Sequence, residues 1–205
     1  MNPIYIAIAS FFLGIVLGHG SRRVYSPQNR GELLVRKAIQ KHFSSPSYHL
    51  LNHVTLRHGG KTTQIDHILV SSFGIFVIET KHYKGWIFAN PTRESWTQVL
   101  FNAKFKFQNP IHQNYGHVVA VRELLDFLPQ DLIKSVVVFS GDAEFKTDIP
   151  IGVFTLPMLI DYLKSCTEEL LSVNRVQFSV GRIETARLAI SKKTDVEHIA
   201  TLGKF

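Results

Sequence analysis

Apolar residues recur along this chain with two periods, and each period predicts a different element. Where they return every three or four positions, they line one face of a helix. This pattern covers residues 31–43, 110–128 and 157–171, and a candidate helix around 181–190 lies in an otherwise ambiguous stretch, 173–205. Pro46, which stands between two serines, ends the first helix, and Pro157 favours the start of the third.

Continuous or alternating apolar residues predict strands over 48–56, 66–81, 85–88, 135–139 and 153–155. Within residues 66–81, the apolar runs 68–70 and 75–78 are joined by Ser-Ser-Phe-Gly, which predicts a β-hairpin with a short turn. Residues 135–139 are continuously apolar, as in strands buried in the middle of a sheet. The order helix, three strands, helix, strand predicts an α/β domain with a mixed sheet flanked by helices.

The predicted hairpin brings three charged side chains together. It folds Asp66 toward Glu79, and Lys81 shares a face with Glu79 because the two are two residues apart. Buried carboxylates are costly unless they pair or hold a metal. A hard divalent ion such as Mg²⁺ would bind there through oxygen, and the lysine would serve a water bound to it. The alternative is a salt-bridge cluster on the surface at a strand end.

The first twenty residues carry no charged side chain, and residues 4–18 are nearly all apolar. A membrane span needs about 17–25 residues, so this run is slightly short. Arg22 and Arg23 follow it, whereas a signal peptide carries its positive charge in front. By the positive-inside rule we expect a single-pass transmembrane anchor over 1–20, a linker over 21–30 and the body of the protein in the cytoplasm. A cleaved signal and a buried helix are the alternatives.

The formal net charge of +7 comes from the N-terminal third of the chain. Residues 1–65 hold eight Lys or Arg and one acid, whereas residues 66–205 hold fifteen of each sign. This excess predicts contact with nucleic acid or anionic lipid, unless it only sets membrane orientation. The single cysteine, Cys166, excludes an intrachain disulfide and a cysteine-cluster zinc site, and none of the ten histidines has the spacing of a zinc motif.

The chain resembles a known family in a set of short motifs. These are Gly31-Glu32, Ile65-Asp66-His67, Ile78-Glu79-Thr80-Lys81, Gly85 and Asn109-Pro110-x-x-Gln113. They are similar to the nuclease-related domain (NERD), which is placed in the PD-(D/E)xK nuclease superfamily. The resemblance spans about residues 31–139 and implies a restriction-endonuclease-like core over 31–141, with residues 142–205 as a C-terminal α/β extension of the same domain.

The resemblance also implies roles for individual residues. Asp66 and Glu79 would be metal ligands, with the Thr80 carbonyl as a third, and Lys81 would be the catalytic lysine. The implied cofactor is Mg²⁺ or Mn²⁺. Glu32 would be an auxiliary acid on the first helix, for which a favourable charge in the first helical turn is the alternative.

Gln113 is the implied site residue on the second helix, and an ordinary polar position is the alternative. Some exonucleases of the superfamily carry a tyrosine four residues after this glutamine, where this chain has His117. Tyr115, only two residues on, would face elsewhere. Strand alternation turns His67 and His82 to the face opposite the predicted site.

We therefore expect a membrane-anchored, metal-dependent nuclease that acts on DNA or RNA, with DNA favoured. The residues expected to contact backbone phosphates are Arg36, Lys37, Lys41, Lys104 and Lys106. Phe105 and Phe107 either stack on bases or pack in the core. Two other classes fit the composition: a catalytically idle nucleic-acid- or protein-binding module tethered to the membrane, and a peripheral lipid-binding protein that uses the basic N-terminal third.

Overall fold

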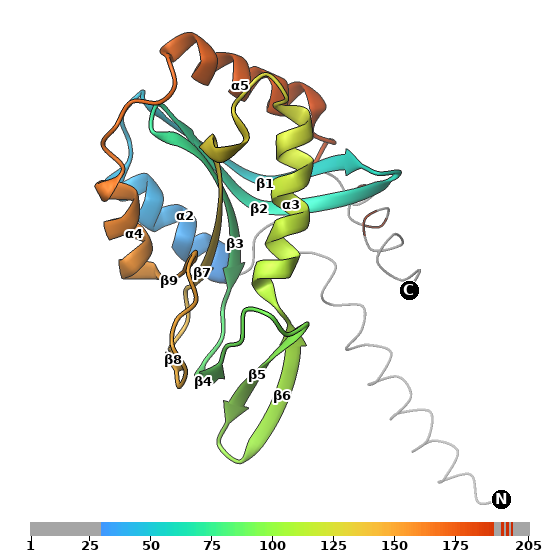
Figure 1. Ribbon diagram of the computed structural model, residues 1–205, viewed down its shortest axis with the longest axis vertical. Helices are drawn as coiled ribbons and strands as arrows, with labels where there is room; N and C mark the ends of the chain where they lie inside the picture. Colours follow the sequence, from blue (N-terminus) through green and yellow to red (C-terminus); the bar gives the residue numbers. More distant parts are fainter. Residues whose placement is uncertain (1–29, 191–193, 195, 197, 199–205) are drawn as a thin grey trace, which may run out of the picture.

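The computed structural model describes residues 30–190 together with 194, 196 and 198 (Figure 1). At its centre lies a five-stranded sheet in the order β1-β2-β3-β7-β9. Its strands are β1 (Tyr48–His58), β2 (Lys61–Ser71), β3 (Gly74–Lys81), β7 (Ile133–Phe139) and β9 (Val153–Thr155). The first three strands are antiparallel, whereas β7 pairs in parallel with both β3 and β9, so the sheet is mixed.

Helices cover both faces of this sheet (Figure 1). On one face, α2 (Arg30–His42) and α4 (Leu156–Ser165) pack in a hydrophobic cluster with Phe76 and Ile78 of β3. On the other face, α3 (Pro110–Leu124) and α5 (Val173–Ala186) pack in a second cluster with Ile75 and Val77, and the short helix η2 (Gln130–Leu132) leads from α3 to β7. Because β3 is covered on both sides, all of its residues except Lys81 are buried, and residues 75–78 are apolar without interruption.

A smaller sheet, in the order β6-β5-β4-β8, extends beyond the end of β3 (Figure 1). Its strands are β4 (Gly85–Phe88), β5 (Ser95–Leu100), β6 (Ala103–Gln108) and β8 (Ala143–Phe145). A third cluster, which includes Ile87, Trp96 and Phe139, joins it to the main sheet. Gly85 starts β4 with φ +76°, and a Cβ there would lie 2.4 Å from the Val99 carbonyl oxygen, so glycine alone fits.

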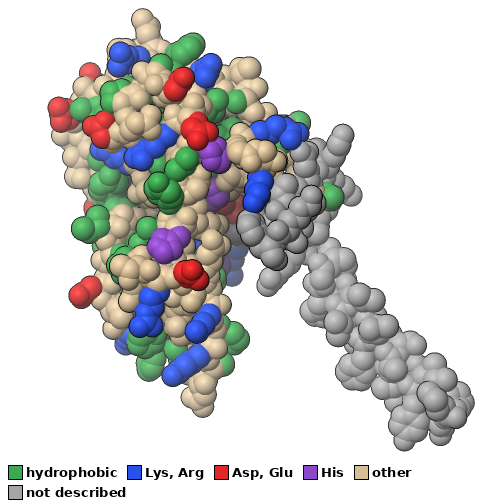
Figure 2. Space-filling view, turned by 45° about the vertical axis from the view of Figure 1, so that its right-hand side comes forward, with side chains coloured by type: hydrophobic (Ala, Val, Ile, Leu, Met, Phe, Trp, Pro, Cys, Tyr) green, Lys and Arg blue, Asp and Glu red, His purple; other side chains and the backbone are tan. Residues whose placement is uncertain are grey.

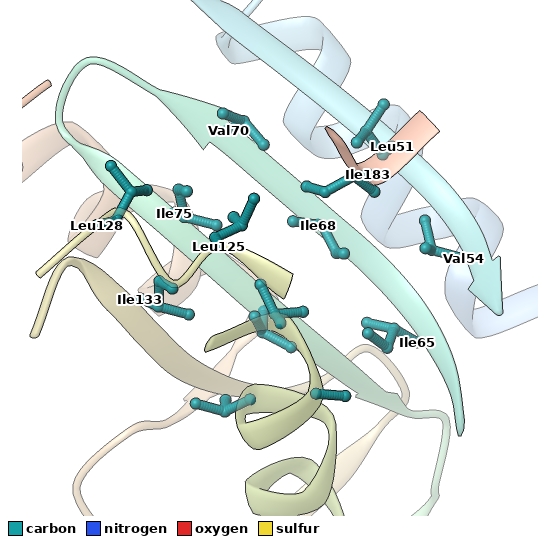
Figure 3. Close-up of a cluster of buried hydrophobic side chains, with 14 of the residues drawn as sticks. Leu51, Val54, Ile65, Ile68, Val70, Ile75, Leu125, Leu128, Ile133 and Ile183 are labelled. Atoms are coloured by element: carbon teal, nitrogen blue, oxygen red, sulfur yellow. The ribbon is translucent and has the colours of Figure 1, made fainter. Parts of the chain in front are cut away.

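The strands β1 and β2 change the face that they present at one matched position. Residues three apart in a regular strand point to opposite faces. Leu51 and Val54 of β1 nevertheless both point into the cluster beneath α3 and α5, and so do Ile65 and Ile68 of β2 (Figure 3). Each strand therefore contains one irregular step, and the two steps face each other.

This irregular step involves His53 and Asp66. The β1–β2 ladder pairs Asn52 with His67 and Val54 with Ile65, and it skips the pair that would lie between them. His53 has φ +53°, in the left-handed region that side chains rarely adopt. Arg187, directly after α5, donates hydrogen bonds to the carbonyl oxygens of Asn52 at 3.2 Å and His53 at 3.3 Å, and so holds the irregular step from outside the sheet.

The structure confirms the predicted α/β class, and its mixed sheet flanked by helices fits a restriction-endonuclease-like core. Three predicted helix boundaries are wrong. The helix predicted over 110–128 ends at Leu124. The helix predicted over 157–171 ends at Ser165 because the N–H groups of Leu170 and Leu171 donate to the Ser72 carbonyl oxygen at 2.8 and 2.9 Å instead of continuing it. The helix expected at 181–190 is α5, which starts at Val173 after its cap Ser172. The pattern also does not predict β5, β6 and β8.

The predicted localisation is contradicted. The segment expected to anchor the chain, residues 1–20, lies outside the described residues. In the part of the chain that the structure describes, no helix has the length and apolar character needed to cross a bilayer. The 15 residues of α3 fall short of the about 20 that a span requires. The inference rested on the apolar run of residues 4–18, which is itself shorter than a span.

Replacing Arg187 by alanine is expected to lower the free energy of unfolding by about 1–3 kcal/mol, because two carbonyl oxygens lose a charged donor. Urea denaturation of the full chain measures the change. Arg182→Ala is the matched control, since this α5 side chain also donates to a carbonyl oxygen, that of Leu124, but is 44% exposed against 16% for Arg187. Equal losses in the two variants would contradict the role given to Arg187.

Candidate active site

The predicted site residues gather where β2 and β3 separate. The β2–β3 ladder ends at the pair His67 and Ile78, whereas β3 continues beside β7 as far as Lys81. In the gap, the Asp66 carboxylate takes the place of the missing strand partner: its Oδ2 accepts a hydrogen bond from the Thr80 backbone N–H at 2.7 Å. The irregular step at His53 and Asp66 releases this side chain from the regular alternation and lets it reach β3.

Glu79 and Lys81 lie on the face beneath α3, together with Gln113 of that helix. The Lys81 ammonium donates to Glu79 Oε1 and to Gln113 Oε1, both at 2.8 Å. Glu79 is buried, with 3% of its surface exposed. Asn109 caps α3 by accepting a hydrogen bond from the N–H of Ile111, which fixes where the helix begins and hence where Gln113 points. The structure thus brings together the residues expected from the hairpin and the second helix.

His117 also belongs to this group, although the sequence interpretation gave it no role. It lies one turn after Gln113 on α3 and is 7% exposed. Its Nε2 is 3.2 Å from Glu79 Oε2, an ion-pair separation without the alignment of a hydrogen bond, and its Nδ1 is 2.7 Å from Thr63 Oγ1. The four-residue spacing from Gln113 was the signal that could have found it. Tyr115 is 63% exposed and faces elsewhere, as expected.

The opposite face of the sheet contributes Glu32 and His67. Glu32 is buried in the first turn of α2, and its charge is one of the influences that raise the pKa of Asp66. His67 is fully buried, with Nδ1 2.7 Å from Asn52 Oδ1. Burial lowers the pKa of His67 to about 4, and the charge of Arg36 acts in the same direction. His67 is therefore a neutral packing residue at neutral pH, on the face predicted for it.

Asp66 and Glu79 have pKa values displaced in opposite directions. Burial raises the pKa of Asp66 well above its ordinary value of 3.8, and the charges of Glu79 and Glu32 raise it further against the opposing effect of Thr80 and Lys81. For Glu79, burial alone also acts upward, but the contact with His117 and the charge of Lys81 together hold its pKa below the ordinary value of 4.5. Glu79 thus has a hydrogen-bonded partner for Oε1 only, and its Oε2 is buried without a hydrogen bond, whereas the negative charge of Asp66 is poorly balanced.

The chemistry of these donors fits a hard divalent cation. Half-buried Asp66 and buried Glu79 offer carboxylate oxygens, and a cation beside them would relieve the repulsion that raises the pKa of Asp66. Within the residues described, no group of three or more His, Cys, Asp or Glu is arranged to hold a metal ion by itself. Mg²⁺ does not need such a group, because it is commonly held by one or two carboxylates and completes its shell with water and phosphate oxygens.

The residues predicted to contact phosphates lie in two separate places. Lys37 and Lys41 are exposed on α2, on the sheet face opposite α3, whereas Arg36 is half-buried and close enough to His67 to lower its pKa. Lys104 and Lys106 are exposed on β6 of the smaller sheet. The two aromatic residues between and after these lysines differ in environment.

Phe107 packs in the cluster that joins the two sheets, with its ring centroid 4.6 Å from that of Tyr83. Phe105, in contrast, is 49% exposed. The sequence interpretation left stacking and core packing open for both side chains. The structure gives core packing to Phe107 alone.

A restriction-endonuclease-like core with Asp66, Glu79 and Lys81 at the separation of two strands defines a nuclease-like α/β domain. The nuclease-related domain (NERD) matches residues 27–140, which is more than half of the chain, and the chain belongs to this family, whose general kind is the PD-(D/E)xK superfamily. An uncharacterized protein of Bacillus anthracis is 45% identical over 97 residues. These residues make up 47% of this chain and 45% of that protein, so the match spans about half of each. No solved structure matches the chain.

Neutralising the two carboxylates is predicted to change stability in opposite directions. Because the pKa of Asp66 is raised on folding, the ionised group costs stability as pH rises above 3.8 and through its folded pKa, so Asp66→Asn should be more stable than wild type at neutral pH and equal to it below 3.8. The amide can still accept the Thr80 N–H. Because the pKa of Glu79 is lowered, its stabilisation is present above 4.5 and lost as pH falls through its folded pKa.

Glu79→Gln should accordingly be less stable than wild type at neutral pH. Urea denaturation in EDTA, at neutral and at acidic pH, measures both differences for the full chain. Changes of the same sign in the two variants would show that the electrostatic description of the pair is wrong.

Proposed function

We propose that this protein is a metal-dependent nuclease that hydrolyses phosphodiester bonds of nucleic acid, with DNA favoured. The observation that carries the proposal is the cluster of Asp66, Glu79, Lys81 and Gln113 at the point where two strands part. Membership of the nuclease-related family supports the same reaction class.

Asp66 and Glu79 would hold the ion, Mg²⁺ or Mn²⁺, with the Thr80 carbonyl as a further oxygen ligand. When bound, the ion supplies polarisation of the phosphoryl oxygen, a lowered pKa for water and stabilisation of the leaving oxygen. Glu32 acts indirectly, since its negative charge raises the pKa of Asp66 and so strengthens the demand for a cation at that position.

Lys81 orients the attacking water. An ammonium group has three N–H donors, and Glu79 and Gln113 accept two of them at 2.8 Å. The remaining donor points in a direction that these two contacts fix before the substrate binds. Such preorganisation lets the group favour the reacting geometry without rearranging during the reaction. The water oxygen would form a bond to phosphorus and give up a proton to solvent, while the bond from phosphorus to the leaving oxygen breaks and that oxygen takes up a proton from solvent.

His117 is the positioning residue for Glu79. Its Nε2 lies against Glu79 Oε2, and the contact of its Nδ1 with Thr63 fixes the orientation of the ring. The carboxylate is therefore held from one side by the lysine and from the other by the imidazole, which keeps it directed at the shared position.

Cleavage is predicted to require Asp66 and Lys81. With Mg²⁺ or Mn²⁺, Asp66→Asn and Lys81→Met should each slow cleavage by about 10²-fold or more, because each removes a group that acts on the reacting atoms. The full chain would be assayed on plasmid, linear duplex and single-stranded DNA and on RNA, with EDTA as the metal-free control. Lys164→Met, an exposed lysine of α4, is the matched control and should cleave as wild type does.

A folded wild-type chain that cuts none of these substrates would contradict the proposal. It would favour a second candidate, a catalytically idle nucleic-acid-binding module, for which one observation speaks: Glu79 already has an ion-pair partner in Lys81 without a metal. Calorimetric titration with Mn²⁺ separates the two candidates. The nuclease requires an affinity that Asp66→Asn abolishes, whereas the idle module requires none.

A further inference from the structure

The smaller sheet presents an exposed face that combines aromatic and basic side chains. On β4, Trp86 and Phe88 flank the buried Ile87 and are 48% and 40% exposed. The strand register places Val99 beside Trp86 and Thr97 beside Phe88 on β5, and the next strand, β6, adds two lysines. The residues of this outer face are Trp86, Phe88, Thr97, Val99, Lys104 and Lys106, with Glu144 of β8 beside Trp86.

The packing of the smaller sheet does not account for these aromatic residues. Its inner side supplies Ile87, Trp96 and Phe107 to the cluster that joins it to the main sheet. Trp86 and Phe88 point the other way, and they are among the large hydrophobic side chains that remain exposed. Exposed aromatic groups that lie together on one strand are typical of a surface that binds a partner.

The charge around the outer face favours a polyanion as that partner. Residues 83–109 contain four basic residues, Lys84, Arg93, Lys104 and Lys106, against one acid, Glu94. Lys146, in the loop after β8, has its Nζ 4.8 Å from the centroid of the Trp86 ring and is ion-paired with Glu144 of β8, so these two charges offset each other. In the lower part of the space-filling view, where the smaller sheet lies, Lys and Arg side chains gather beside hydrophobic ones (Figure 2).

A small cavity adjoins Trp86 on this sheet. It measures about 230 Å³ and is lined by Gly85, Trp86, Val99 and Phe101. Phe101, in the β5–β6 turn, is 99% exposed and stands at its edge. A flat ring that entered this space would meet the indole of Trp86 on one side and aliphatic or aromatic groups on the others.

The outer face is connected directly to the candidate active site. β4 begins four residues after Lys81, and α3, which carries Gln113, begins two residues after β6. Asn109 ties the two parts together, since its buried side chain donates to the carbonyl oxygens of Pro91 at 3.1 Å and Arg93 at 2.8 Å while it caps α3. The smaller sheet is therefore held in a fixed position relative to Gln113.

We propose that the outer face binds single-stranded nucleic acid, with bases stacked on Trp86 and Phe88 and phosphates in contact with Lys104 and Lys106. Stacking requires bases that are not already paired, and it tolerates any sequence because every base has a π face. The inference rests on the proposed function, because it names the form of nucleic acid that the Asp66–Lys81 centre receives.

The test separates binding from cleavage. Full-length Asp66→Asn protein in EDTA binds without cutting, and fluorescence anisotropy of a labelled oligothymidine measures its affinity. Adding Trp86→Ala is expected to weaken binding about 5- to 100-fold, the loss of one stacked base. Trp86→Phe keeps an aromatic ring and should retain most of the affinity. Phe178→Ala, which removes an aromatic side chain 55% exposed on α5, is the matched control and should bind unchanged.

The charged part of the face has its own readout. Changing both Lys104 and Lys106 to glutamine should flatten the dependence of log affinity on log salt by about 0.7 for each phosphate that a lysine no longer neutralises. Intrinsic fluorescence adds a direct probe, since Trp86 is exposed and Trp96 is buried. Oligothymidine should quench the emission, and Trp86→Phe should remove the quenching.

Unchanged affinity of the Trp86→Ala protein, or equal weakening by Phe178→Ala, would overturn the inference. A duplex probe that competes as well as the single strand would also overturn it. Failure of the proposed function looks different: wild type would not cut any substrate in Mg²⁺ or Mn²⁺, while Trp86-dependent binding persisted. Cleavage by wild type together with binding that does not depend on Trp86 would support the proposed function and overturn the inference about the outer face.

Discussion

The candidate site depends on one hydrogen bond, from the Thr80 backbone N–H to the Asp66 carboxylate. β3 separates from β2 and continues beside β7. Without the Asp66 carboxylate, the backbone N–H of Thr80 would be a buried donor with no acceptor, at a cost of about 1–3 kcal/mol. Asp66 reaches the gap because β1 and β2 break their alternation together, with Arg187 holding the break. Asp66 therefore does two things: it accepts the hydrogen bond that the Thr80 backbone N–H needs, and it places a carboxylate in the candidate site.

The electrostatics of the site follow from which carboxylate has partners. Lys81 and His117 hold the pKa of Glu79 below its ordinary value, whereas burial and neighbouring acids leave Asp66 with a raised pKa. Packing alone does not favour such a residue, because an unbalanced buried charge lowers stability. Unbalanced charge in a buried cluster is typical of functional sites, where a ligand completes the balance. The stability lost at Asp66 is, in this account, the basis of affinity for a cation.

Local patterns made the central hairpin predictable, because both apolar runs, the turn and the three charged residues lie within 16 positions, 66–81. His117 and Thr63 were not predictable in the same way, since their contact depends on how α3 sits on β2. The irregular step at His53 depends on Arg187, 134 residues away. The outer face of the smaller sheet emerges only when three short strands pair, and the sequence showed just the strand over 85–88 and the basic stretch, 104–107. The expected membrane localisation is contradicted, because none of the helices in the described part of the chain is long and apolar enough to cross a bilayer.

The most direct test of the account is a crystal structure of the full chain grown with Mn²⁺, examined for anomalous scattering at the metal edge. The account predicts one strong peak within coordination distance of the Asp66 and Glu79 carboxylates, with Lys81 still in contact with Gln113. An Mn²⁺ peak elsewhere, or none in crystals where Glu79 keeps both Lys81 and His117 as its only partners, would contradict the claim that this cluster is a metal centre.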